Sequence, residues 1–68
     1  MSGVCGSCEN KGYSGTTVLG AVEEGDSYYR RGRYEEARRC YEKALNILDF
    51  HGGCRNCKDE IERKIDKC

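Results

Sequence analysis

The chain has 68 residues, and its twelve Lys and Arg are balanced by twelve Asp and Glu. A formal net charge of zero argues against a general nucleic-acid or membrane-surface binder. With no Trp, one Phe and one Met, the apolar inventory is small. A domain of about 60 residues usually needs a disulfide, a metal or a partner besides its core. The sequence therefore predicts one small domain, residues 1–68, with such a stabilising element.

The beginning of the chain bears on the compartment. It shows neither the basic n-region nor the apolar h-region of a signal peptide. No apolar run approaches the about 20 residues that a membrane span requires. We therefore expect a cytoplasmic protein with no membrane contact. In such a reducing compartment, paired cysteines bind metal more often than they form disulfides.

Residues 1–17 hold four of the nine glycines, together with Ser, Thr and Asn. No apolar residues recur there at the helical period, so we expect loop and turn, and no strand is evident in the chain.

The rest of the sequence predicts an all-α fold with three helices. Thr17 is a suitable N-cap for a first helix over residues 18–31, and Gly32 fits the left-handed position after its end. A second helix begins at Tyr34 and ends within residues 48–53, where two glycines follow. Its apolar residues recur at three- and four-residue steps: Ala37, Tyr41, Ala44, Leu45 and Leu48. A third, amphipathic cap helix is expected over residues 57–68, with Cys57, Ile61 and Ile65 on one face.

The first two helices resemble one tetratricopeptide repeat, a helix–turn–helix motif, over residues 18–49. Gly25 stands at the position where the helices cross, Tyr28 at the aromatic position of helix A and Gly32 at the turn. The helix B positions are occupied by Tyr34, Ala37, Tyr41 and Ala44. The chain departs from the family pattern with Ala21 for Trp, Glu24 for Leu and Asp49 for Pro. It also carries one repeat where the family normally stacks at least three.

The resemblance implies a small protein-interaction adaptor with a protein or peptide partner. It implies a concave contact face on helix A, formed here by Val22, Asp26, Tyr29 and Arg30. Family members that grip a C-terminal carboxylate carry Lys and Asn where this chain has Val22 and Asp26, so that binding mode is not expected. Self-association stays open, because a lone repeat exposes a side that a neighbouring repeat would cover.

Two Cys-x-x-Cys pairs, Cys5/Cys8 and Cys54/Cys57, offer the four thiolates that zinc prefers in closed structural sites. If the two hairpin helices are antiparallel, the start of the first lies beside the end of the second. Both pairs then reach the same end of the helices. The sequence predicts one structural Zn²⁺ per chain on these four residues. A filled site leaves no open position for substrate, and no catalytic constellation is visible, so we do not expect an enzyme.

The stretch over residues 5–15 carries a second resemblance, because Cys-x-x-Cys is followed by Gly-Tyr-x-Gly. It resembles the zinc loops of secretion and pilus assembly ATPases and, loosely, the cysteine–glycine repeats of J-domain co-chaperones. This resemblance supports zinc and not an ATPase, since the chain has no phosphate-binding loop ending in Lys-Ser/Thr.

Several alternatives stay open from the sequence. The paired cysteines can instead form disulfides, or serve thiol redox chemistry or metal delivery. His51 can replace one cysteine as a ligand, although a loop position is the simpler expectation. Cys40 is expected in the core and Cys68 at the exposed end, and a disulfide between them would be strained. An arginine cluster offers a nucleic-acid surface as a further alternative: Arg30, Arg31, Arg33, Arg38 and Arg39.

Overall fold

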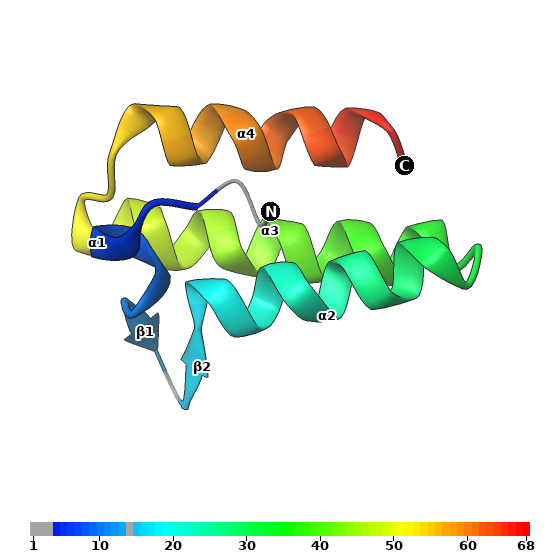
Figure 1. The fold of residues 1–68 in the computed structure, drawn as a ribbon, viewed down its shortest axis with the longest axis horizontal. Helices are drawn as coiled ribbons and strands as arrows, with labels where there is room; N and C mark the ends of the chain where they lie inside the picture. Colours follow the sequence, from blue (N-terminus) through cyan, green and yellow to red (C-terminus); the bar gives the residue numbers. More distant parts are fainter. Residues whose placement is uncertain (1–3, 14) are drawn as a thin grey trace.

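The structure is a computed structural model that describes residues 4–13 and 15–68. Its elements in chain order are α1 (Gly6–Glu9), β1 (Gly12–Tyr13), β2 (Thr16–Thr17), α2 (Val18–Arg30), α3 (Tyr34–His51) and α4 (Arg55–Asp66). The helices α2 and α3 form an antiparallel hairpin, and α4 lies along α3 and runs back toward the α2–α3 turn (Figure 1). The predicted all-α fold with a helical hairpin and a third helix is confirmed.

The ends of the hairpin helices follow from local chemistry. The side chain of Thr17 accepts a hydrogen bond from the backbone N–H of Gly20 at 3.0 Å, as its N-cap position predicts. α2 ends at Arg30, one residue earlier than expected, and Gly32 then adopts a φ of 79° that side chains disfavour. α3 continues to His51, because its C-cap is the left-handed Gly52.

The core lies where α2 and α3 face each other. Val18, Val22, Ala37, Ala44 and Leu48 have no exposed surface. Small residues on both helices allow close packing, and at Gly25 the ring of Tyr41 lies directly against the backbone of α2. A Cβ atom built there would lie 2.6 Å from the ring of Tyr41. The predicted role of Gly25 as the small residue at the helix crossing is therefore confirmed.

The helix α4 covers one side of this hairpin. It begins at Arg55 and ends at Asp66, so it lies about half a turn earlier than the predicted range of residues 57–68. Cys57 and Ile61 are buried and Ile65 is partly buried against the core, so the three residues predicted to form the apolar face of this helix do pack inward. Between α4 and α2, the ammonium group of Lys64 donates to the carboxylate of Asp26 at 3.4 Å. The amphipathic character predicted for the cap helix is confirmed.

The segment before α2 is more regular than expected. One helical turn, α1, is followed by the antiparallel pair β1–β2, with Gly12 opposite Thr17 and Tyr13 opposite Thr16. The expectation that the chain has no strand was wrong, because two-residue strands are too short to produce a period in the sequence. Of the predicted loop over residues 1–17, positions 1–3 and 14 lie outside the described residues.

Candidate metal centre

The four cysteines of the two Cys-x-x-Cys pairs meet at one end of the helices. All four Sγ atoms, from Cys5, Cys8, Cys54 and Cys57, lie within 4.8 Å of one another. The Sγ of Cys54 is 3.7 Å from that of Cys5, 3.6 Å from that of Cys8 and 3.0 Å from that of Cys57. The Sγ atoms of Cys5 and Cys57 are 3.5 Å apart. The two pairs are far apart in the sequence, and the antiparallel hairpin brings them together.

Each pair sits where a helix begins. Cys5 is the N-cap of α1 and Cys54 is the N-cap of α4, so Cys8 and Cys57 lie in the first turn of their helices. Cys8 and Cys57 are each 2% exposed, whereas Cys5 and Cys54 face solvent. The backbone N–H of Cys5 also donates to the Sγ of Cys57 at 3.3 Å. Such an N–H stabilises negative charge on sulfur, which suits a thiolate ligand.

The arrangement divides the thiols by acidity. Hydrogen bonds from Cys57, first through its side chain and then through its backbone, lower the pKa of Cys54 to about 7. Burial raises the pKa of Cys57 to about 12. Without a cation, four adjacent thiolates would repel one another, and the buried ones would lose solvation. A bound metal ion would remove both penalties, because it supplies positive charge at the centre of the cluster.

The spacing of the sulfur atoms fits a tetrahedral metal. With metal–sulfur bonds of about 2.3 Å, the sulfur atoms of a tetrahedral site lie about 3.8 Å apart. The observed separations of 3.5, 3.6 and 3.7 Å are close to that value, and the shorter one of 3.0 Å lies within one Cys-x-x-Cys turn. The four cysteines could therefore hold a metal ion with small side-chain adjustments.

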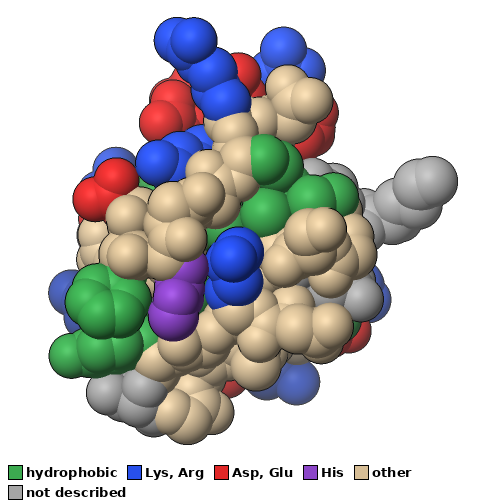
Figure 2. All heavy atoms as spheres, turned by 90° about the vertical axis from the view of Figure 1, so that its left-hand side faces the viewer, with side chains coloured by type: hydrophobic (Ala, Val, Ile, Leu, Met, Phe, Trp, Pro, Cys, Tyr) green, Lys and Arg blue, Asp and Glu red, His purple; other side chains and the backbone are tan. Residues whose placement is uncertain are grey.

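His51 does not join this cluster. It is the last residue of α3, not a loop residue as expected, and its Nε2–H donates to the backbone oxygen of Gly12 at 2.6 Å. This contact fastens β1 to the end of α3. The histidine is exposed at the end of the molecule that Figure 2 views. Its interaction with β1 assigns it a structural role beside the cysteines.

The two remaining cysteines lie apart from the cluster. Cys40 is buried in α3, as expected, and its thiol donates to a carboxylate oxygen of Glu24 at 3.5 Å. Cys68 was expected to be exposed, but it packs partly against the core because the chain after α4 folds back toward the hairpin. Its thiol donates to the backbone oxygen of Lys64 at 3.5 Å. All six thiols are free in this structure.

The predicted contact face of α2 is only partly available. Val22 has no exposed surface, so its assignment to a partner-binding face needs correction: it packs in the core. Asp26 accepts hydrogen bonds from Tyr41 and Lys64, which makes it a bridge between helices. Tyr29 is 37% exposed and Arg30 lies at the surface beside it.

The arginine cluster lies around the α2–α3 turn, at the end of the hairpin opposite the cysteines (Figure 1). All five side chains are exposed: Arg30, Arg31, Arg33, Arg38 and Arg39. Arg33 forms an ion pair of 3.8 Å with Glu36, one turn further along the chain. Interspersed acidic residues reduce the positive potential that a nucleic-acid surface needs.

Two exposed aromatic residues were not singled out from the sequence. Tyr13 is 58% exposed and Phe50 is 69% exposed, and their ring centroids lie 5.2 Å apart. Phe50 lies outside the apolar stripe of α3, and this position in the sequence was the one indication that its side chain is not part of the core. Phe50 also makes an edge-to-face contact with His51, with ring centroids 5.1 Å apart, and Figure 2 shows hydrophobic side chains beside the single histidine.

Comparison with known proteins agrees with the hairpin. The tetratricopeptide repeat family matches residues 19–50. No curated protein and no solved structure matches the chain. Within residues 4–13 and 15–68, no helix combines the length and the apolar content needed to cross a membrane. The matched segment spans nearly all of α2 and α3, so these two helices constitute a tetratricopeptide-like helical repeat.

Proposed function

We propose that this protein is a small, non-catalytic protein-interaction adaptor whose helical repeat is stabilised by one structural Zn²⁺. The observation that carries the proposal is the meeting of four cysteine Sγ atoms at one end of a tetratricopeptide-like hairpin. Such repeats commonly act as scaffolds for protein contacts, and the cysteines supply the stabilising element that a lone repeat needs.

Zinc suits this set of ligands better than other common ions. Four thiolates are soft ligands, which disfavours calcium and magnesium, and tetrahedral sulfur sites are typical of structural zinc. The proposal requires reduced thiols, as in the cytoplasm. Four protein ligands would fill the coordination sphere and leave no place for a reacting water. The site is therefore proposed to be structural.

The hairpin has a physical need for such a site. In longer tetratricopeptide arrays, each repeat is covered by its neighbours, whereas here one helix, α4, covers α3 and the short elements α1 and β2 contact α2. α4 contributes only Cys57 and Ile61 as buried residues, which is a small apolar surface. Structural zinc sites contribute about 10–16 kcal/mol of apparent binding free energy, which is comparable with the stability of a whole domain. Zinc would join α4 to α1 and thereby fix both against the hairpin.

The proposed contact surface lies on the exposed part of α2. Tyr29 packs edge-to-face on Tyr34, with ring centroids 5.1 Å apart, and Arg30 is exposed next to it. Tyr and Arg are the residue types that most often dominate protein interfaces. Asp26 lies one turn before Arg30 and adds a half-buried carboxylate at the edge of this surface.

Native mass spectrometry of the protein purified without added metal tests the proposal. We expect one zinc per chain with all thiols reduced. Cys54→Ser should lose the metal, because it removes the ligand that contacts all three others. Cys68→Ser is the matched control and should retain the metal, since Cys68 lies outside the cluster. A metal-free wild type with a mass lowered by two hydrogens for each disulfide would overturn the proposal.

A further inference from the structure

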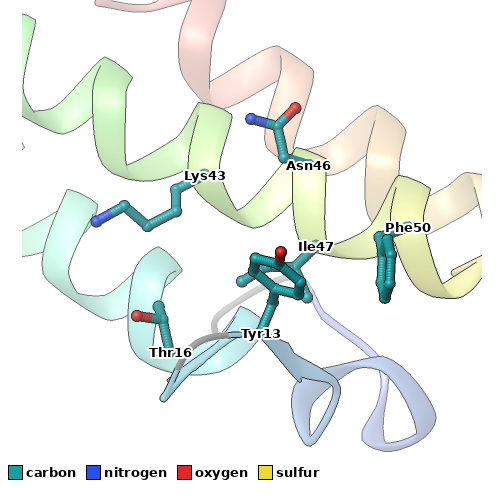
Figure 3. Close-up of a pocket in the computed structure, with 6 residues that line it drawn as sticks. All are labelled: Tyr13, Thr16, Lys43, Asn46, Ile47 and Phe50. Atoms are coloured by element: carbon teal, nitrogen blue, oxygen red, sulfur yellow. The ribbon is translucent and has the colours of Figure 1, made fainter.

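An open groove lies between the β1–β2 pair and the outer face of α3. Its volume is about 520 Å³, and its lining consists of Tyr13, Thr16, Lys43, Asn46, Ile47 and Phe50. In Figure 3 the ring of Tyr13 projects from β1 toward α3, with Phe50 to one side and Lys43 and Thr16 to the other. The β1–β2 pair and α4 lie on opposite sides of the hairpin (Figure 1).

The groove combines an apolar site with one charge. Ile47 is 4% exposed and belongs to the core, whereas the aromatic rings of Tyr13 and Phe50 stay largely exposed to water. Lys43 is the charged residue of the lining, and its side chain is exposed. Asn46 adds an amide that can both donate and accept hydrogen bonds.

The two sides of the groove are held in position before any ligand arrives. Tyr13 is fixed by its pairing with Thr16, and its neighbour Gly12 accepts the hydrogen bond from His51. Phe50 is fixed by the last turn of α3 and by an edge-to-face contact with Tyr13. Because the two rings already contact each other, ordering them on a ligand costs less conformational entropy, which favours affinity.

The size of the groove points to a short segment and not to a second copy of the chain. A stable interface buries about 800 Å² on each partner and uses about 20–30 residues a side. That area would be about a sixth of the 4602 Å² surface of this protein, whereas the groove has only the six lining residues named above. A peptide segment of a few residues suits a groove of this size, and the exposed ammonium group of Lys43 favours a negatively charged partner.

We propose that this groove is a docking site for a short acidic peptide segment of another protein. An aromatic or large aliphatic side chain of the peptide packs against the exposed rings of Tyr13 and Phe50, and a neighbouring Asp or Glu pairs with Lys43. The groove is distinct from the α2 surface proposed above for the adaptor function. It specifies an acidic peptide as the partner, which the helical repeat alone does not.

Selection of short random peptides displayed on phage against the zinc-loaded protein tests this proposal. The enriched peptides should share an apolar anchor and an acidic residue at a fixed distance from it. For the best peptide, made synthetically, Phe50→Ala should weaken binding about tenfold or more, because an exposed aromatic that forms one side of a pocket acts as a hot spot. Lys43→Glu should abolish the acidic preference, and Lys43→Arg should preserve it.

Tyr34→Ala provides the matched control, because Tyr34 is an exposed aromatic at the opposite end of α3 and should leave peptide binding unchanged. Phe50 and Lys43 are exposed, so unchanged far-UV circular dichroism is expected for all variants. Three outcomes would overturn the proposal: no enrichment of a common motif, binding that is lost in Tyr34→Ala but kept in Phe50→Ala, or dimerisation in sedimentation that Phe50→Ala abolishes. Because the protein is zinc-loaded and its metal content is measured separately, failure here leaves the metal site untouched.

Discussion

At the scale of single residues, Gly25 and Tyr41 determine how closely α2 and α3 approach. The ring of Tyr41 occupies the space that a side chain at position 25 would need. The hydroxyl of Tyr41 donates a hydrogen bond to the carboxylate of Asp26, the residue that follows Gly25 in α2. Burial, aided by this hydrogen bond and by the charge of Asp26, raises the pKa of Tyr41 well above its ordinary value. Tyr41 therefore remains neutral in the folded protein, as a buried phenol that donates to a carboxylate must.

Gly25→Ala should destabilise the protein, although alanine is the better helix former. Alanine in a helix interior gains about 0.5–1 kcal/mol over glycine, whereas overpacking a core costs about 1–3 kcal/mol. The new methyl group would lie 2.6 Å from the Tyr41 ring, so the packing cost should prevail. Urea denaturation of the zinc-loaded protein measures the difference. Ser27→Ala, at an exposed site of the same helix, is the control and should be neutral or stabilising.

The single residues also show how far the sequence can predict this site. The Cys-x-x-Cys spacing identified four cysteines that the structure brings together, because an antiparallel hairpin returns the chain to the same end. The burial of Val22 and the groove beside Phe50 could not be read from the repeat pattern. Val22 belongs to the buried core cluster, and Phe50 borders a groove that includes a strand pair with no sequence period.

At the scale of elements, α4 covers one side of the helical hairpin. Its apolar face packs on α3, its charged face remains in solvent, and Lys64 connects it to Asp26 of α2. Both partners of that ion pair are about a quarter exposed, so the pair is a modest contribution. Most of the docking energy of α4 must come from Ile61, Ile65 and the cysteine cluster.

Ile61→Ala should therefore loosen α4 from the hairpin. Ile61 has no exposed surface. Replacing a buried isoleucine by alanine lowers the free energy of unfolding by about 2–5 kcal/mol. Thermal unfolding followed by circular dichroism should show a lower midpoint with zinc bound. Glu62→Ala changes the exposed neighbour in the same helix and should leave the midpoint nearly unchanged. An Ile61→Ala midpoint equal to that of the wild type would show that α4 does not depend on this contact.

At the scale of the whole molecule, the cysteine cluster connects parts that otherwise share few contacts. It joins α1 at the start of the chain to the beginning of α4, while His51 and Tyr13 join the strand pair to α3. The helical class and the hairpin were predictable, because α2 and α3 carry caps and a helical apolar period. The fold of the N-terminal segment was not, because one helical turn and two-residue strands are too short to produce a period in the sequence.

The central claim is that zinc on the four cysteines holds this small helical domain together. Far-UV circular dichroism of the protein, recorded while a chelator of increasing concentration removes the metal, tests it most directly. We expect the helical signal to fall as zinc leaves and to return when zinc is restored, because the free energy of zinc binding contributes to folding when the unfolded chain has no preformed site. Cys68→Ser should behave in the same way as the wild type. Helicity that stays unchanged under a large excess of chelator, with metal loss verified by mass, would contradict the account.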